Sequence, residues 1–522
     1  MRKRLLAGCI ALIAFIGLVS TAAFAPSAPS DITPPLSAQW VFSMGVDPMN
    51  VARPVIQDNR VYVSHRGVLH CLDNVTGAEK WTFEPEKAAV TTAPVLWEDL
   101  IIVGATNAIV YGIDANTGDP VWEHICASSV APDPLVFGDM LLVGAGQMVY
   151  ALSPATGDAS WICSLTSTAM TGPISDGSMV YFLCQDGTVQ CVDARQGRYR
   201  WACRLLTGPR TFRPIVAGQR VIVASGNRVY GVARSGAVAW TAEMPAGVGG
   251  APTLVGDVIY VPCVDGKIYI LYARSGAPRR SIEYKVDHSM TAPPAVTETV
   301  VAAGSGDALI YVFDRASGAV KWTYRCRAPD RVANEAAENG IYAPITVAGG
   351  SLYCLTGSGD LYRFSASAPD PAGPVFGDFD PEPGSAITGG QYVRAVCSIT
   401  DDGTGVDPAS VTGSIDGTPL DVTFDPVDGV ATLRASIVPD GSHILKVSAR
   451  DYRGHETSTE WSFVTDVSII PTPEVTSPGQ AGAAGARGGR GGGRGGGGGG
   501  RGGRGGGGGG GGRGGRGGRG GR

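Results

Sequence analysis

The sequence predicts an all-β protein: an eight-bladed β-propeller, then a smaller β-sandwich, then a disordered Gly/Arg tail. Three observations predict the propeller. A glycine followed four residues later by a tryptophan returns about every forty residues, a proline starts each repeat, and two β-rich runs separated by a turn follow each proline. Short strands rich in Val, Ile and Tyr and bounded by Gly and Asp are typical of hairpins, and four such strands make one propeller blade.

The Gly-to-Trp motif predicts one turn and one strand of each repeat. The glycine supplies the positive φ that ends a tight turn, and the tryptophan begins the next strand with a large ring to bury. Aspartates four residues before the glycine are placed to cap the turn, at Asp73, Asp114, Asp193 and Asp314. A further copy of the motif, Gly276 to Arg280, lacks the ring. We predict structural docking roles for seven tryptophans: Trp40, Trp81, Trp122, Trp161, Trp201, Trp240 and Trp322.

The prolines count the blades. Eight of them begin repeats: Pro54, Pro94, Pro134, Pro173, Pro214, Pro252, Pro294 and Pro344. The eighth repeat ends at Tyr362-Arg363-Phe364 with no Gly-to-Trp motif after it, whereas Trp40 stands before the first proline with no repeat in front of it. We therefore predict that residues 39–44 form the outermost strand of the last blade, which closes the ring and removes two exposed sheet edges.

The two ends of the chain differ in composition from its body. Three basic residues, an apolar run from Leu5 to Val19 and the small-residue site Ala23-Phe24-Ala25 predict a signal peptide. The protein is therefore expected to be exported, soluble and monomeric, in the periplasm, at the cell surface or outside the cell, because no later stretch reaches the ~18 apolar residues of a membrane helix. The predicted organisation is a signal peptide at 1–25, a linker at 26–37, the propeller at 38–368, the sandwich at 374–467, a linker at 468–486 and the tail at 487–522.

The forty-residue period is lost between about residues 376 and 466. Asp-Gly turns there separate five β-rich runs: Tyr392–Ile399, Ser410–Ser414, Ala431–Ile437, His443–Ala449 and Thr459–Val464. Short strands of this kind predict an immunoglobulin-like sandwich, and the segment is similar to bacterial Ig-like modules of surface proteins. The acidic loop from Asp401 to Asp407 offers calcium ligands, although solvated turn acids are the commoner explanation.

The pattern Ala-x-Asp-x-x-Thr-Gly-x-x-x-Trp, seen at residues 151–161 with Ser153 in place of the aspartate, resembles the tryptophan-docking repeat of propellers of the PQQ (pyrroloquinoline quinone) type. The resemblance covers about residues 38–368. This family includes quinoprotein alcohol dehydrogenases and non-enzymatic members such as the BamB lipoproteins of the outer-membrane β-barrel assembly machinery. The non-enzymatic members imply an exported scaffold that binds protein or envelope polymers, in envelope or outer-membrane protein assembly.

The enzymatic members imply a quinone stacked between a tryptophan and a disulfide of adjacent cysteines, beside a calcium ion held by acids. This sequence has no Cys-Cys pair, and Trp97 is the only propeller tryptophan outside a predicted docking strand. The six histidines show no metal-ligand spacing, and loops this short cannot wall in a cofactor. We therefore predict no catalytic, cofactor-binding or metal-binding residues, and keep a PQQ- and Ca²⁺-dependent oxidoreductase as the alternative.

Ten cysteines follow the predicted signal peptide. Cys163 and Cys203 share one repeat position and Cys184 and Cys263 another, which favours small buried core residues over crosslinks. The exception is Cys184 with Cys191, across one tight turn, where export permits a disulfide bridge.

Two segments are candidates for partner binding. An insert between blades seven and eight lengthens a loop on a rigid scaffold, although a tolerated surface insertion explains it equally; its candidate residues are Arg327, Asp330, Arg331, Glu335 and Glu338. The Gly/Arg tail cannot bury a core and is predicted to be disordered. Its nine arginines would bind a polyanion in a salt-dependent way. The alternative is that the tail is a spacer without a partner. The arginines are Arg487, Arg490, Arg494, Arg501, Arg504, Arg513, Arg516, Arg519 and Arg522.

Overall fold

The computed structural model describes residues 31–46, 52–205, 212–279, 282–326, 340–389 and 392–469, and all of these belong to one compact unit that ends at Ile470. They are almost wholly β-structure, with one 3-10 turn, η1 (Pro408–Ser410). No helix in this part of the chain has the length and apolar character needed to cross a membrane. The predicted signal peptide, the insert residues Arg327 to Glu338 and the arginines of the tail lie outside the described residues.

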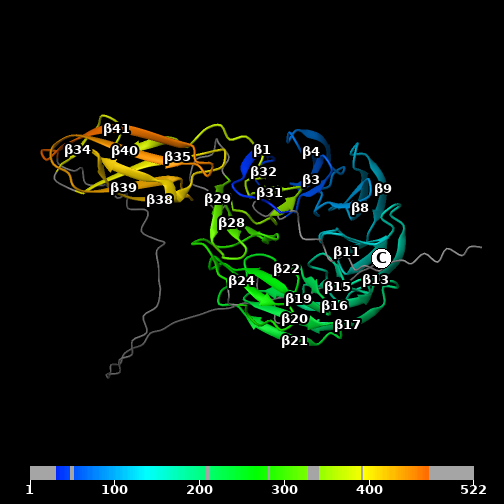
Figure 1. Cartoon of the computed structure of the whole chain (residues 1–522). Helices are drawn as coiled ribbons and strands as arrows, with labels where there is room; N and C mark the ends of the chain where they lie inside the picture. Colours follow the sequence, from blue (N-terminus) through cyan, green and yellow to red (C-terminus); the bar gives the residue numbers. More distant parts are fainter. Residues whose placement is uncertain are drawn as a thin grey trace, which may run out of the picture. The chain divides into compact units, whose positions relative to one another are not determined.

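Eight four-stranded antiparallel sheets follow one another around a ring (Figure 1), as the eight prolines predict. Seven of these blades take four consecutive strands each. The first four blades contain β2 (Val55–Gln57), β3 (Arg60–His65), β4 (Val68–Asp73), β5 (Glu79–Phe83); β6 (Val95–Trp97), β7 (Leu100–Gly104), β8 (Ile109–Asp114), β9 (Pro120–Ile125); β10 (Leu135–Phe137), β11 (Met140–Ala145), β12 (Met148–Leu152), β13 (Ala159–Ser164); and β14 (Ile174–Ser175), β15 (Met179–Leu183), β16 (Thr188–Asp193), β17 (Tyr199–Arg204). The next three contain β18 (Ile215–Ala217), β19 (Arg220–Ser225), β20 (Arg228–Ala233), β21 (Val238–Glu243); β22 (Thr253–Val255), β23 (Val258–Pro262), β24 (Lys267–Tyr272), β25 (Tyr284–Lys285); and β26 (Ala295–Val296), β27 (Val300–Gly304), β28 (Leu309–Asp314), β29 (Val320–Arg325).

The eighth blade joins the two ends of the propeller. It contains β30 (Thr346–Ala348), β31 (Ser351–Leu355), β32 (Asp360–Ser365) and, as its outermost strand, β1 (Ser37–Ser43) from the start of the described chain. β1 runs antiparallel to β32 and places Val41 opposite Tyr362. The predicted closure by residues 39–44 is therefore confirmed, and it pairs an edge of the sheet that would otherwise be open.

Six tryptophans dock on the next blade as predicted. Each indole Nε1 donates a hydrogen bond to a backbone carbonyl in the neighbouring glycine turn, for example Trp122 to Pro154 O at 3.0 Å. The same hydrogen bond joins Trp40 to Asn74 O, Trp81 to Ala115 O, Trp161 to Ala194 O, Trp201 to Arg234 O and Trp240 to Ala273 O. The ring then covers the glycine: a Cβ on Gly157 (φ +74°) would lie 2.5 Å from Cε3 of Trp122. The motif therefore needs glycine for its φ and for the ring packed on it.

The four motif aspartates cap the glycine turns as predicted. Asp73 Oδ1 accepts hydrogen bonds from the backbone N–H groups of Val75 and Thr76 at 2.9 and 3.0 Å. The same pattern recurs at Asp114, Asp193 and Asp314. A basic residue of the following strand joins three of them, and the hydrogen bond from Arg200 to Asp193 lowers the pKa of that carboxyl.

The docking hydrogen bond differs at two places in the ring. Blade six has no tryptophan, and the hydroxyl of the fully buried Tyr284 donates a 2.7 Å hydrogen bond to Arg315 O, three residues before Gly318. Blade eight has no glycine turn, because its outer strand comes from the start of the chain. Trp322 of blade seven therefore donates to Thr404 O, in the sandwich, at 2.8 Å.

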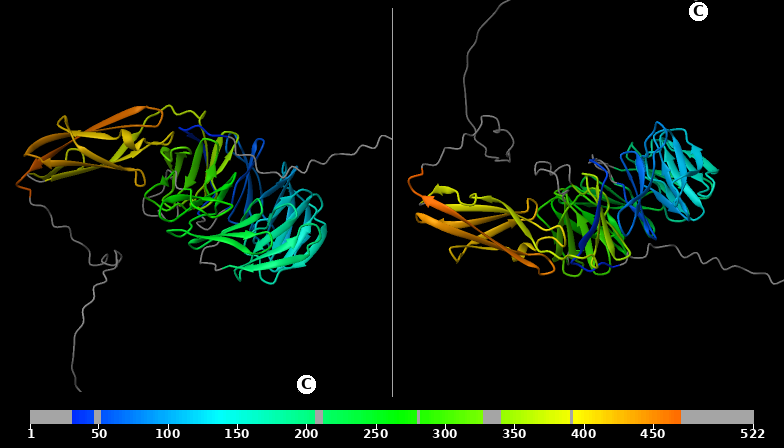
Figure 2. Two further views of the ribbon diagram at one scale, coloured as in Figure 1. Left: turned by 60° about the horizontal axis from the view of Figure 1, so that its bottom comes forward. Right: turned by 90° about the horizontal axis from the view of Figure 1, so that it is seen from above.

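Residues after the propeller form two facing sheets that enclose a separate core, shown in Figure 2. One sheet has the order β33 (Val375–Asp380), β35 (Tyr392–Thr400), β39 (Val430–Ile437), β38 (Asp421–Asp425). The other has the order β34 (Ala386–Thr388), β41 (Glu456–Asp466), β40 (Gly441–Arg450), β36 (Thr412–Ile415), β37 (Thr418–Pro419). The five predicted strands are present, together with four that were not predicted, β33, β34, β37 and β38. The assignment to the immunoglobulin-like class stays a prediction.

The ten cysteines of the described chain are all free thiols, so the predicted Cys184–Cys191 bridge is wrong. The strand register explains why. Cys191 lies opposite Tyr181 and packs in the cluster of Tyr181 and Leu183. Cys184 follows Leu183 and packs with Phe182 in the cluster on the other face of the sheet. Burial raises the pKa of both thiols to about 12, as expected for core residues.

Candidate functional site at the mouth of the propeller channel

The residues that precede the eight repeat prolines form a ring around the propeller axis. Each proline leads into the innermost strand of its blade, and innermost strands of neighbouring blades contact one another. Five of the eight residues have small or imino-acid side chains, which leave space at the axis. In blade order the ring is Arg53, Ala93, Asp133, Gly172, Arg213, Ala251, Pro293 and Ala343.

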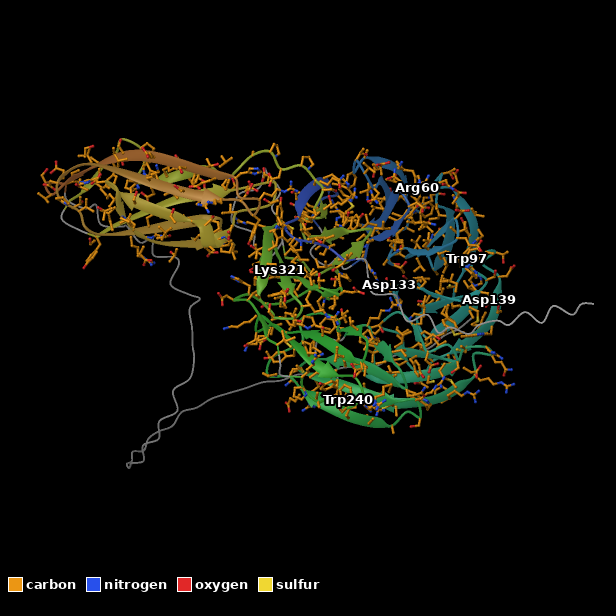
Figure 3. The ribbon with its side chains drawn as sticks, viewed as in Figure 1. Arg60, Trp97, Asp133, Asp139, Trp240 and Lys321 are labelled. Carbon is orange, nitrogen blue, oxygen red and sulfur yellow. The ribbon has the colours of Figure 1, made fainter. Side chains whose placement is uncertain are left out.

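A pocket of about 380 Å³ lies at this ring on the side of blades one to five. Its walls combine the β3–β4 hairpin with the segments that lead into the next four blades. Figure 3 places Asp133 at the centre of the ring, whereas Trp240 and Lys321 lie in its outer part. The lining residues are Ala52, Ser64, His65, Arg66, Gly67, Val90, Thr91, Thr92, Ala93, Ala131, Pro132, Asp133, Met170, Thr171, Gly172 and Arg213.

Hydrogen bonds between neighbouring blades hold the charged residues of the ring. Asp133 Oδ1 accepts a 2.8 Å hydrogen bond from Ala93 N. Arg213 Nη2 donates a 3.0 Å hydrogen bond to Pro173 O. Gly172 lies so close to the backbone carbonyl of Asp133 that a Cβ there would clash with it. The backbone therefore fixes where the two charged side chains begin.

The protein around the ring perturbs both arginines. Burial lowers the pKa of Arg213, and the Asp133 carboxylate acts in the opposite direction. Burial also lowers the pKa of Arg53, and the charge of Arg213 lowers it further. Arg53 still contacts solvent, so this is the desolvation of a channel wall and not of a closed core. The ring therefore places two guanidinium groups within electrostatic reach of each other beside a single carboxylate.

Polar groups of the wall add hydrogen-bonding capacity. The buried hydroxyl Oγ1 of Thr171 has no hydrogen-bond partner among the described residues. His65 is buried, and its Nε2 lies 2.6 Å from Gly45 O. The lining residues include no tryptophan and no cysteine. Trp97, the tryptophan outside the docking series, ends β6 and packs in the core between blades two and three.

The residues predicted from the sequence to bind a partner do not include this site. Its signal was present, because Arg53, Asp133 and Arg213 occupy one repeat position that is otherwise Ala, Gly or Pro. Comparing the same position across all eight repeats would have identified it. The predicted binding residues of the insert and the tail are not among the described residues, so they stay predictions.

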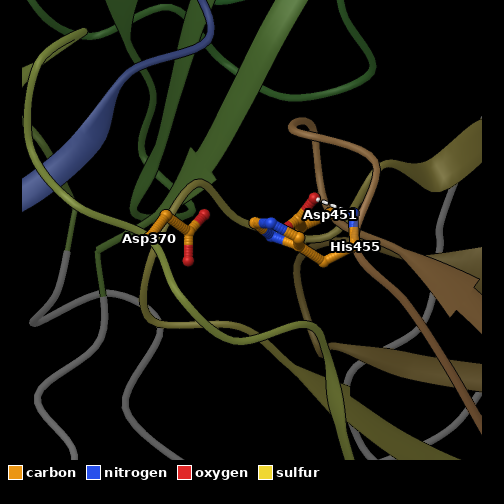
Figure 4. A group of neighbouring side chains, drawn as sticks. All are labelled: Asp370, Asp451 and His455. Atoms are coloured by element: carbon orange, nitrogen blue, oxygen red, sulfur yellow. Dashed lines mark hydrogen bonds and ion pairs between the residues drawn. The ribbon is translucent and has the colours of Figure 1, made fainter.

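A second group of polar side chains lies where the sandwich meets the propeller (Figure 4). Asp370, Asp451 and His455 bring their ligand atoms within 4.8 Å of one another. Asp370 Oδ2 accepts from Thr404 N at 2.8 Å, and Asp451 Oδ2 lies 2.6 Å from His455 Nδ1. Asp401, in the loop predicted to offer calcium ligands, accepts hydrogen bonds from the N–H groups of Gly403 and Gly405. These contacts position the loop that receives Trp322.

Burial raises the pKa of the Asp401 carboxyl to about 6. The charges of Asp370 and Asp451 raise it too, against the hydrogen bond from Gly405 N. The raised pKa of Asp401 therefore reflects its burial first and the two neighbouring carboxylates second.

Comparison with known proteins agrees with the repeat pattern. The family model described as "Outer membrane protein assembly factor BamB" matches residues 37–174, 145–288 and 280–368. The BamB of Burkholderia pseudomallei is 26% identical over 262 residues, which cover 46% of this chain and 68% of that protein. The crystal structure of BamB from Moraxella catarrhalis superposes with a TM-score of 0.51 at 16% identity, covering 63% of this chain and 99% of that one.

A quinohemoprotein alcohol dehydrogenase from Comamonas testosteroni also superposes, with a TM-score of 0.50 at 14% identity over 69% of this chain and 79% of that one. At this identity the likeness concerns the fold alone. Over residues 37–368, the chain belongs to the family of repeat propellers described as outer membrane protein assembly factor BamB.

Proposed function

We propose that this protein is an exported, non-catalytic binding scaffold that takes part in the assembly of outer-membrane or envelope proteins. The family match across the whole propeller is the observation that carries the proposal. The relatives in that family are named as assembly factors, and assembly factors act by holding other proteins. The channel mouth is the surface we assign to a protein partner, because it is the charged, recessed part of an otherwise regular ring.

The proposed absence of catalysis has support in the tryptophans. Six indoles are committed to glycine turns and the seventh to the sandwich. None of them lines the described pocket, which also has no cysteine in its wall. A quinone would therefore lack the ring and the disulfide that the resemblance to quinoproteins implies.

A PQQ- and Ca²⁺-dependent oxidoreductase remains the alternative, because the Comamonas dehydrogenase shares the propeller fold. The two functions are separated by adding the quinone and calcium to the purified protein and recording its absorbance spectrum. A stoichiometric, bound quinone that is reduced by an alcohol would favour the enzyme. An unchanged protein spectrum after removal of free quinone is expected for the scaffold.

Site-specific photo-crosslinking in the native cell tests the scaffold role. The crosslinker is placed at Met170, which lines the pocket and is 43% exposed, or at Ile162, which is 52% exposed on β13. Adducts with a component of the outer-membrane assembly machinery are expected from Met170 and not from Ile162. Equal labelling from both positions, or no adduct from Met170, would contradict a partner surface at the channel mouth.

The insert and the tail are proposed as secondary contacts. Repeating the experiment with a chain that ends at Pro478 measures what the tail arginines add. A partner that depends on the tail should be lost at high salt, whereas a partner held by the propeller should remain.

A further inference from the structure

The charged residues of the channel ring are arranged unevenly. Arg53 belongs to blade one and Arg213 to blade five, so the two arginines lie four blades apart in a ring of eight and face each other across the axis. Asp133 belongs to blade three, between them. Two positive charges and one negative charge leave this ring with a net positive charge at the mouth of an acidic protein body.

The residues that the structure describes use few of the guanidinium donors. Within the described part of the chain, Arg213 donates one hydrogen bond, from Nη2 to Pro173 O. Arg53 forms no hydrogen bond or ion pair with any of the residues that the structure describes. Each guanidinium group carries five N–H donors, more than these described contacts use. The mutual repulsion of the two groups is a second reason why an anion between them would be favourable.

The pocket, which is lined by Arg213 and by Ala52 next to Arg53, is large enough for a ligand. Its volume of about 380 Å³ lies in the range of small-molecule sites. The wall offers the unpartnered hydroxyl of Thr171 and an apolar part formed by residues such as Val90, Ala131 and Pro132. A flat charged surface would lack this combination of a recess, donors and apolar contacts.

We propose that the channel mouth binds a carboxylate group, held by Arg53 and Arg213, with Asp133 disfavouring more highly charged anions. Guanidinium groups bind carboxylates in a bidentate way with charge-assisted hydrogen bonds. Arg66 also lines the pocket, and the Asp133 carboxylate repels a doubly charged phosphate more strongly than a single carboxylate group. The carboxylate is carried by an acidic side chain of a polypeptide or by a small organic acid. This inference goes beyond the proposed function, because it concerns the ligand's chemistry and does not depend on a role in assembly.

Calorimetric titration of the full mature protein tests the proposal. The probes are an acetylated Glu-containing tetrapeptide amide, the same peptide with Gln in place of Glu, and the monocarboxylate butyrate. Arg53→Gln with Arg213→Gln should weaken binding of the Glu peptide at least about tenfold, since a hydrogen bond to a charged group contributes about 1.5–3 kcal/mol. Asp133→Asn should strengthen it severalfold, because the amide keeps an oxygen for Ala93 N and loses the negative charge.

The matched control is Arg195→Gln with Arg198→Gln, which removes the same charge from two exposed arginines of an outer turn and should leave affinity unchanged. Arg53→Gln alone guards against misfolding, because Arg53 contacts no described partner, and it should still weaken binding. Preference for the peptide over butyrate identifies a polypeptide ligand, and the reverse identifies an organic acid. Equal binding of the Glu and Gln peptides, unchanged affinity in the double arginine variant, or no binding of either acid would overturn the proposal. The crosslinking experiment at Met170 tests the scaffold role separately, so its outcome does not depend on these titrations.

Discussion

The indole Nε1 of Trp322 donates a 2.8 Å hydrogen bond to the backbone carbonyl of Thr404, which lies 82 residues further along the chain. The other docking tryptophans reach partners 32 to 34 residues away, in the next blade. Blade eight cannot supply such a turn, because β1 provides its outer strand. The sandwich loop of Asp401 to Gly405 takes its place, with Gly405 at φ +83° and its N–H bonded to Asp401 Oδ1.

Further contacts extend this junction. The hydroxyl of Tyr324 donates to Asp402 O at 3.1 Å, and Tyr452 of the sandwich lies 2.8 Å from the hydroxyl of Thr323. Arg453 donates to the carbonyls of Ala366 and Ala368 at 2.8 and 2.7 Å. The sandwich therefore completes the docking series of the propeller.

Trp322→Phe should loosen the sandwich from the propeller. The ring keeps its packing, but Thr404 O loses its donor, and a buried carbonyl without a partner costs about 1–3 kcal/mol. Hydrogen exchange should quicken at residues 401–405 while the midpoint of thermal unfolding falls. Trp240→Phe is the control, because it removes the equivalent bond to Ala273 O within the propeller. Equal exchange at residues 401–405 in both variants would refute the role of Trp322 as a junction.

Asp401→Asn should stabilise the junction at neutral pH. The folded state raises the pKa of Asp401 to about 6, so the protonated form favours folding at low pH and this contribution is lost as the pH rises from about 4 through 6. Asparagine keeps an acceptor for Gly403 and Gly405 without the charge. We expect a gain of about 1 kcal/mol at pH 7.5, discounted for partial exposure, and no difference at pH 4. Denaturant unfolding at both pH values measures it; an equal effect at the two would exclude titration as the cause.

Gly157→Ala should cost more than Gly138→Ala, although both glycines have positive φ. The strained backbone costs about 1–2 kcal/mol for alanine at either position. Only Gly157 lies beneath an indole, with 2.5 Å between an added Cβ and Trp122 Cε3, whereas nothing lies within 4 Å of a Cβ at Gly138. The difference in free energy of unfolding between the variants, expected at about 1–3 kcal/mol, measures the ring contact. Equal losses would mean that φ alone requires the glycine.

A chain that begins at Ala52 should unfold at a much lower temperature or aggregate. It lacks β1, so β32 becomes an unpaired edge and Gly77 loses the Trp40 ring that covers it. A chain that begins at Ile32 keeps β1 and should behave like the mature protein apart from the two hydroxyl contacts of Asp31. Scanning calorimetry with light scattering distinguishes the two. An unchanged melting midpoint in the shorter chain would contradict closure of the ring through β1.

Repetition determined what could be read from the sequence. Trp40 to Trp240, the capping aspartates and the eight prolines recur in one register, so each copy reports on the same environment and local rules predict all of them. The closure by residues 39–44 followed from counting, because seven repeats were complete and one was short of a strand. The acidic loop at Asp401 was visible in the sequence, but its contact with Trp322 was not.

The tertiary structure alone decided the features that depend on contacts between distant segments. Cys184 and Cys191 are seven residues apart along the chain, yet the two-residue period of the strands puts them on opposite faces of one sheet. Tyr284 replaces a missing indole because its hydroxyl reaches the same carbonyl position from a different register. Arg53 and Arg213 come within electrostatic reach of each other only in the folded ring, because they lie four blades apart along the chain.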